Sequence, residues 1–65
     1  MEKVEYRARL QAVIPKMPKY YGVLIAAKHP GIKPRDIYNV VAKGTYNEQV
    51  LLAMEDVFLS NDVNS

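Results

Sequence analysis

The stretch AKHPGIKPRDIYNV, residues 27–40, decides the fold because it spaces small and aliphatic residues as two crossing helices require. Ala27 places a small side chain where a second helix is expected to cross the first closely. Gly31 follows four positions later and is the residue type that most easily adopts the positive φ of a tight turn. Ile32 comes next and is expected to anchor the turn in the core. These residues predict one helix that ends before Gly31 and another that begins soon after it.

The second helix of this pair is predicted over residues 34–43. Pro34 suits the first position of a helix, and Gly44 is typical of the position that follows a last turn. Ile37 and Val40 stand three residues apart, so both side chains are expected to face the core. Two helices joined in this way form a helix-turn-helix, whose second helix usually lies in the major groove of DNA. DNA binding is therefore the one specific functional hypothesis that the sequence offers.

Residues 2–14 carry two periodicities that lead to different predictions. Apolar and polar residues alternate almost throughout, as in a half-buried strand, which would pair with a second copy across a dimer axis. The helical interpretation has an apolar stripe made of Tyr6, Leu10, Val13, Ile14 and Met17. We favour the helix because Glu5 and Arg9 form a stabilising i, i+4 pair and because the composition of the segment suits a helix.

The whole pattern predicts an all-α fold, a small four-helix bundle that contains the helix-turn-helix. The helices are expected near residues 3–13, 19–28, 34–43 and 47–59. Thr45, with Glu48 three positions later, matches a capping box and predicts the start of the last helix. The expected core comprises Ala27, Ile32, Ile37, Val40, Met54 and Phe58. Residues 1–60 are expected to form one domain, and residues 61–65 a frayed tail.

The composition argues against several classes of function. The chain of 65 residues has no cysteine, and His29, its single histidine, cannot build a zinc site alone and is expected to be an exposed turn residue. The neighbouring Glu55 and Asp56 are expected to be solvated rather than catalytic. No apolar run approaches the ~20 residues that span a bilayer, and the charged start lacks the apolar core of a signal peptide. We expect a cytoplasmic protein that is not an enzyme and has no cofactor, metal, membrane or small-molecule substrate.

The charges are distributed unevenly along the chain. Residues 1–44 hold all nine Lys and Arg against three acidic residues, a balance of +6. Residues 45–65 hold four acidic residues and no Lys or Arg, a balance of −4. Such a polarity suits a protein that turns one side toward a polyanion and the other away from it, and is also compatible with chance in a short chain with solvated faces.

With these residues placed, the chain resembles the Cro/repressor-like helix-turn-helix proteins of phages and bacteria from Tyr20 to about Phe58. The segment VAKGTYN, residues 41–47, looks like the V-L-N-G-x-x-N segment that follows the recognition helix in that group, and the segment VLLAM, residues 50–54, resembles its V-x-x-A-L helix. Two positions depart from the pattern. Lys33 stands where the family usually has a Ser or Thr cap, and Pro30 directly precedes the glycine. The resemblance implies a DNA-binding transcriptional regulator, such as a repressor, that acts as a homodimer.

The resemblance also indicates which side chains would contact double-stranded DNA. Arg suits guanine, Asn suits adenine, and the methyl group of Ala can meet the methyl group of thymine. The expected base contacts are Lys33, Arg35, Tyr38, Asn39 and Ala42. The expected phosphate contacts are Lys19, Tyr20, Lys28, Lys43, Thr45 and Tyr46.

Other functions fit the same sequence. Arg35 and Asn39 are then merely solvated polar residues on an exposed face. The main alternative is a helical protein-interaction module, such as an adaptor or virion component, without base readout. A third is an architectural or recombination-directing DNA-binding protein.

Overall fold

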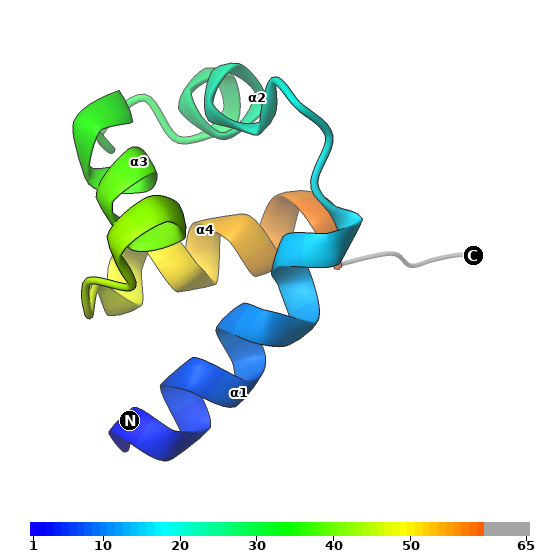
Figure 1. The fold of residues 1–65 in the computed structure, drawn as a ribbon. Coiled ribbons are helices and arrows are strands. Elements are labelled where there is room, and N and C mark those ends of the chain that lie inside the picture. Colours follow the sequence, from blue (N-terminus) through cyan, green and yellow to red (C-terminus); the bar gives the residue numbers. More distant parts are fainter. Residues whose placement is uncertain (60–65) are drawn as a thin grey trace.

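In the computed structural model, residues 1–59 are described and contain four α-helices and no strand (Figure 1). Helix α1 spans Lys3–Val13 and is followed by the short 3-10 helix η1, Ile14–Lys16. The others are α2, Tyr21–Lys28; α3, Pro34–Lys43; and α4, Glu48–Phe58. The prediction of an all-α fold with four helices is confirmed, and the N-terminal segment is a helix rather than a strand. The tail expected at residues 61–65 lies outside the described residues.

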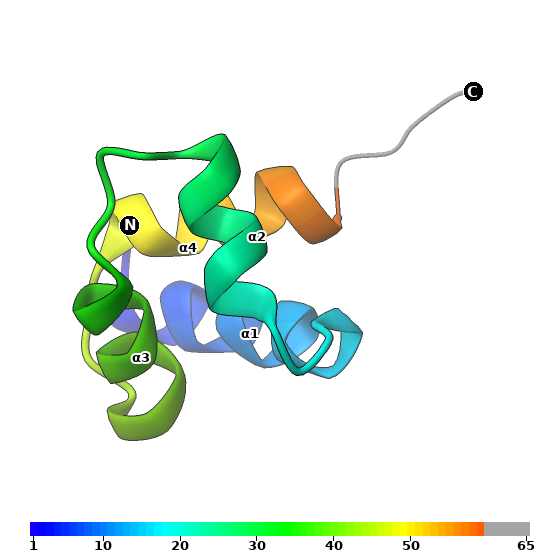
Figure 2. The ribbon, with the colours of Figure 1, turned by 90° about the horizontal axis from the view of Figure 1, so that it is seen from above.

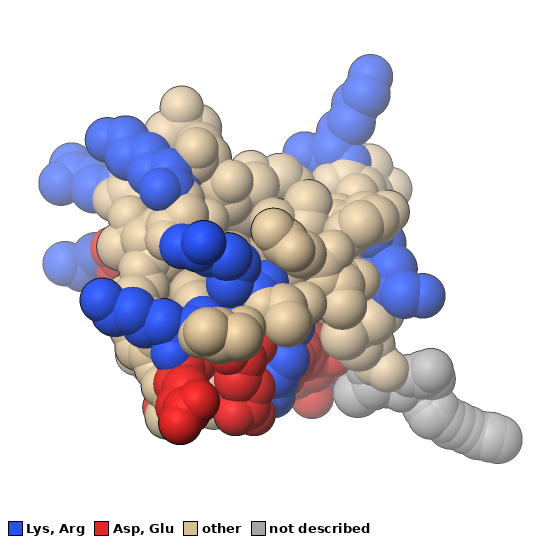
Figure 3. Space-filling view, turned by 60° about the horizontal axis from the view of Figure 1, so that its bottom comes forward, with Lys and Arg blue, Asp and Glu red and all other residues tan. Residues whose placement is uncertain are grey.

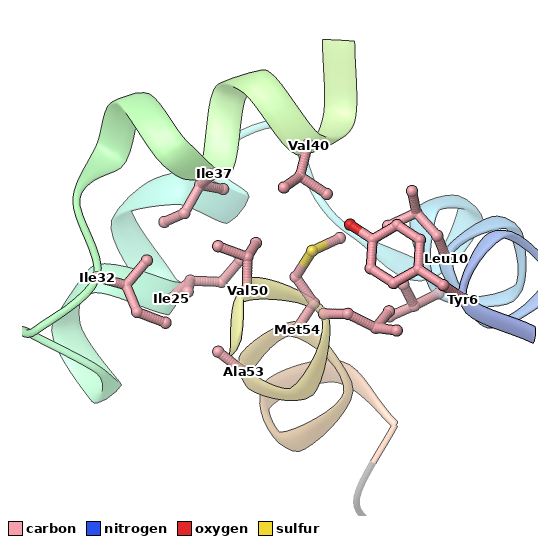
Figure 4. Packing of buried hydrophobic residues seen from close by; sticks show 11 residues of the cluster. Tyr6, Leu10, Ile25, Ile32, Ile37, Val40, Val50, Ala53 and Met54 are labelled. Carbon is pink, nitrogen blue, oxygen red and sulfur yellow. The ribbon is translucent and has the colours of Figure 1, made fainter. Parts of the chain in front are cut away.

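Helix α4 is the element against which α1, α2 and α3 all pack. It runs across the middle of the molecule, with α1 on one side and the α2–α3 pair on the other (Figures 1 and 2). Leu51 and Met54 of α4 are fully buried, and Val50 and Ala53 nearly so. Met54 reaches from α4 toward Val40, with side chains of α1 beside it (Figure 4). The position of each other helix is thus set by its contact with α4.

The apolar stripe predicted for α1 faces this core. Tyr6, Leu10 and Val13 are buried, and Ile14 and Met17 pack against them in part. Of the core residues predicted elsewhere, Ile32, Ile37, Val40 and Met54 are buried and Phe58 is partly buried. These predictions are confirmed: the helical residues were predicted from their spacing, and Ile32 from its place in the turn.

The predicted role of Ala27 is wrong, since its side chain is exposed. Ile25, two residues earlier, is the residue of α2 that is fully buried. Gly31 has no positive φ either, and a Cβ built on it would meet no atom within 4 Å. The reason is the length of the connection, residues 29–33, in which the Ile32 amide donates to the His29 carbonyl at 3.0 Å. A connection of this length reverses the chain without a left-handed residue or a tight crossing at Ala27.

The capping box predicted at Thr45 is also wrong, because Asn47 caps α4. The Asn47 side-chain oxygen accepts the amide of Val50 at 3.2 Å. Tyr6 of α1 engages the same loop: its hydroxyl donates to the Thr45 carbonyl at 2.8 Å and accepts the Asn47 amide at 3.0 Å. This buried tyrosine satisfies two backbone groups of the loop and so joins α1 to the start of α4.

Gly44, in contrast, is in the conformation that its position after α3 predicts. It has a φ of 69°, and its amide donates to the Val40 carbonyl at 3.1 Å. An L-residue in this left-handed region is strained, so Gly44→Ala should lower the free energy of unfolding by about 1 kcal/mol. Gly31→Ala is the matched control and should leave stability unchanged or slightly raised. Chemical denaturation of both variants tests this, and equal losses would contradict the assignment of the turn.

The exposure of Ala27 leads to a second stability prediction. Ala27→Leu should change the free energy of unfolding by less than about 0.5 kcal/mol, because its side chain would project into solvent. Ala53→Leu on α4 should lower it by about 1–3 kcal/mol, because Ala53 is buried against the core. Thermal and urea unfolding of the two variants measures the contrast. A severe loss for Ala27→Leu would mean that α2 is rotated relative to the arrangement seen here.

Candidate nucleic-acid interface

The outer face of α3 presents four of the five expected base-contact residues to solvent. Ile37 and Val40 are each 1% exposed and fix the inner face of the helix against the core. Successive residues of a helix are about 100° apart, so the residues between these two point outward. Asn39 is half-buried, and the exposed members are Lys33, Arg35, Tyr38 and Ala42.

This outer face carries a varied set of contacting groups on a rigid element. Arg35, Asn39 and Ala42 follow one another at helical spacing and so lie along one line of the surface. The guanidinium and amide groups are hydrogen-bonding groups of the kinds that read base edges, and Tyr38, 58% exposed, adds a hydroxyl and a ring beside them. Lys33 occupies the N-cap position of α3 without a side-chain capping bond. Its ammonium group is therefore not used by the helix itself.

The expected phosphate-contact residues lie at the ends of the helices. Lys19 and Tyr20 are exposed just before α2, and Lys43 is exposed in the last turn of α3. Lys28, in the last turn of α2, is held by an ion pair of 3.5 Å to Asp56 of α4. These cations thus mark both ends of α2 and the end of α3.

Thr45 and Tyr46 belong to the loop between α3 and α4, where Tyr6 and Met1 also contact the chain. The Tyr46 hydroxyl donates to the Met1 carbonyl at 2.8 Å, and its ring lies 4.4 Å from that of Tyr6 between centroids. Tyr46 is therefore committed to packing and to an internal hydrogen bond, although its side chain stays partly exposed. The Thr45 carbonyl is used by Tyr6, while its side chain is exposed.

The two acidic residues of α4 expected to be solvated are instead tied to other helices. Glu55 accepts from Arg9 of α1, with the Arg9 Nε 2.9 Å from one carboxylate oxygen and Nη2 bonded to the other. Asp56 lies 3.0 Å from the His29 ring nitrogen and 3.5 Å from the Lys28 ammonium. His29, expected to be an exposed turn residue, is half-buried by this contact. The sequence does not reveal these pairs, because they join residues 27 to 46 positions apart.

Two members of these pairs, Asp56 and Arg9, have pKa values shifted in the direction that ion pairing favours. The hydrogen bond from His29, assisted by the charge of Lys28, lowers the pKa of Asp56 below its ordinary value. The hydrogen bond and charge of Glu55 raise the pKa of Arg9. Both carboxylates therefore bind cations of the same molecule.

Basic and acidic side chains are distributed unevenly over the face shown in Figure 3. Lys and Arg side chains spread over the upper and central parts of the surface in Figure 3, whereas most of the acidic side chains in view gather at its lower edge. A surface divided in this way attracts a polyanion to one side.

Residues 1–59 contain neither a metal-binding cluster nor a membrane-spanning helix. No group of three His, Asp or Glu side chains there is arranged to hold a metal ion. No helix in that part of the chain is both long and apolar enough to cross a membrane.

Comparisons with known proteins add no relative to this picture. No family model matches the chain, and no curated protein sequence or solved structure matches it significantly.

The Asp56 cluster makes stability depend on pH in a defined direction. Because the folded-state pKa of Asp56 is lowered, its contribution to stability is complete above about pH 4, the unfolded-state value, and is lost as the pH falls through the folded-state pKa. Asp56→Asn should therefore lose less stability on acidification than the wild-type protein. Urea unfolding of both at about pH 6 and about pH 3 measures the difference.

His29→Ala provides the companion variant, since it removes the main cause of the lowered pKa of Asp56. The free energy of unfolding that this variant loses on acidification should resemble the loss for Asp56→Asn. Parallel pH profiles for the wild-type and Asp56→Asn proteins would rule out this carboxylate as a source of acid sensitivity.

Proposed function

We propose that the protein is a sequence-specific double-stranded DNA-binding protein, a transcriptional regulator of the Cro/repressor-like helix-turn-helix type that reads the major groove with α3. The observation that carries the proposal is the division of α3 into two faces. Ile37 and Val40 fix one face in the core, and the opposite face exposes Arg35, Tyr38 and Ala42. A short helix held by α2 and α4, with readout-competent side chains on its free side, suits insertion into the groove.

The cations around α3 support the same proposal. Lys19 and Lys43 are exposed at the start of α2 and the end of α3, where they would neutralise phosphates on either side of the groove. Lys28 would contribute less than these two, because Asp56 already neutralises part of its charge. We expect phosphate contacts to position the domain and the α3 side chains to choose the sequence.

A homodimer belongs to this proposal. A single short helix reads only a few base pairs, so two copies on a palindromic site give useful specificity. We expect the regulator to act in the cytoplasm of a bacterial host and to be encoded by the bacterium or by its phage.

One observation favours the alternative of a protein-interaction module. The outer side of α2 exposes apolar side chains at helical spacing: Val23 is 69% exposed, Leu24 37% exposed, and Tyr20 and Ala27 extend the row. Exposed apolar surface of this kind often marks contacts between proteins. This face and the outer face of α3 are distinct, so a contact through α2 is compatible with DNA binding through α3.

Base readout and phosphate contact can be separated by mutation. Selection from random duplex DNA first defines the preferred site. Arg35→Ala or Asn39→Ala should then lose about 1–3 kcal/mol of binding free energy on that site and much less on scrambled DNA. Lys43→Ala should weaken binding to both duplexes and reduce the slope of log K against log salt by about one unit. Fluorescence titration at two salt concentrations measures both effects.

Circular dichroism of each variant provides the folding control, since the substituted side chains are exposed or half-buried. Unchanged specific binding by folded Arg35→Ala and Asn39→Ala proteins would show that α3 does not read bases. Absence of any selected sequence, together with salt-insensitive binding, would place the protein-interaction module ahead.

A further inference from the structure

A groove of about 600 Å³ lies between α1 and the C-terminal part of α3. Its floor is apolar: Ile14, which follows α1, and Val41 of α3 are partly exposed there, and the buried Leu10 and Val40 lie beneath them at the edge of the core. A phosphate backbone has no apolar group that could pack against this floor.

The rim of the same groove is basic. Lys3 and Arg7 of α1 stand one turn apart on one side, and Lys43 of α3 stands on the other. All three are exposed, and no acidic residue lines the groove. Within residues 1–59 none of the three forms an ion pair, whereas Arg9, on another face of α1, binds Glu5 and Glu55. No carboxylate of the described residues thus neutralises the positive charge at the rim.

We propose that this groove binds an acidic amphipathic helix of a partner protein. Leucine-like side chains on one face of that helix would cover the apolar floor, and carboxylates flanking them would pair with Lys3, Arg7 and Lys43. A groove between two helices commonly binds a third, amphipathic helix. Here the basic rim favours a helix that carries negative charge. Because Lys43 also belongs to the proposed phosphate contacts, the bound helix competes with DNA for that cation.

The test uses three stapled synthetic helices and the ¹⁵N-labelled protein. The first peptide has leucines at helical i, i+4 and i+7 positions flanked by glutamates; the second replaces its glutamates with glutamines, and the third replaces its leucines with serines. We expect the first to shift the amide resonances of Gln11, Val41 and Gly44 and to bind roughly tenfold more tightly than the second. The third should not bind, and salt should weaken binding of the first.

Variants of the protein provide the matched controls. Lys3→Glu combined with Arg7→Glu should abolish binding of the acidic peptide and create binding of a fourth peptide, in which lysines replace the glutamates. Lys16→Glu, an exposed substitution in η1 that does not line the groove, should leave the affinity unchanged. Arg35→Ala should also leave it unchanged, so that peptide binding is scored independently of whether the protein reads DNA.

Three outcomes would overturn the proposal. The first is absence of binding by the acidic peptide, or resonance shifts confined to other faces. The second is that random duplex DNA, and not the peptide, shifts the resonances of Lys3 and Arg7. This result would assign these cations to contacts with a nucleic-acid backbone. The third is concentration-dependent shifts at the groove without any peptide, which would assign the groove to a second copy of the chain.

Discussion

Burial of α4 is the constraint on which the other helices depend. A chain this short buries only about 60% of the surface that its unfolded form exposes, so apolar area cannot be spread over several independent contacts. Here one helix supplies it: Leu51 and Met54 of α4 are fully buried, and α1, α2 and α3 all pack against α4. The outer face of α3 is therefore free for recognition only because its inner residues, Ile37 and Val40, meet this central helix (Figure 4).

Polar contacts also join α4 and the loop before it to α1 and to the end of α2. Tyr6 binds backbone groups of the loop before α4, and Glu55 and Asp56 bind α1 and the end of α2 from the far half of α4. Partly exposed ion pairs contribute little to stability, but they fix the rotation of one helix against another. Glu55 and Asp56 of α4 thus neutralise selected cations internally, whereas the exposed Lys and Arg side chains of α3, of the groove beside α1 and of the connection before α2 form no ion pair within residues 1–59.

The parts that the sequence predicted well are those controlled by local chemistry. Helices α1 and α3 have the expected bounds, since Pro34 opens α3 and Gly44, at a φ of 69°, closes it. The prediction for Ala27 was wrong because the spacing of residues shows where small side chains stand but not which side of α2 faces the core. Asn47 was missed as the cap because the choice depends on Tyr6, about 40 positions away, which occupies the Thr45 carbonyl. In the candidate site, the exposure of Arg35 and Tyr38 followed from helical periodicity, whereas the capture of Lys28 by Asp56 required the tertiary fold.

The position of α4 in the chain also has a consequence for synthesis. Domains fold as units as they emerge from the ribosome, beginning from the N-terminus. Here α1, α2 and α3 emerge before the helix against which all three pack, so α2 and α3 have only each other as a partner until residues 48–58 follow. During that interval the emerging segment carries all nine Lys and Arg of the chain and lacks the helix that buries its core residues. Its folding is therefore delayed until α4 is released, and a stop codon within α4 would abolish the whole fold rather than shorten it.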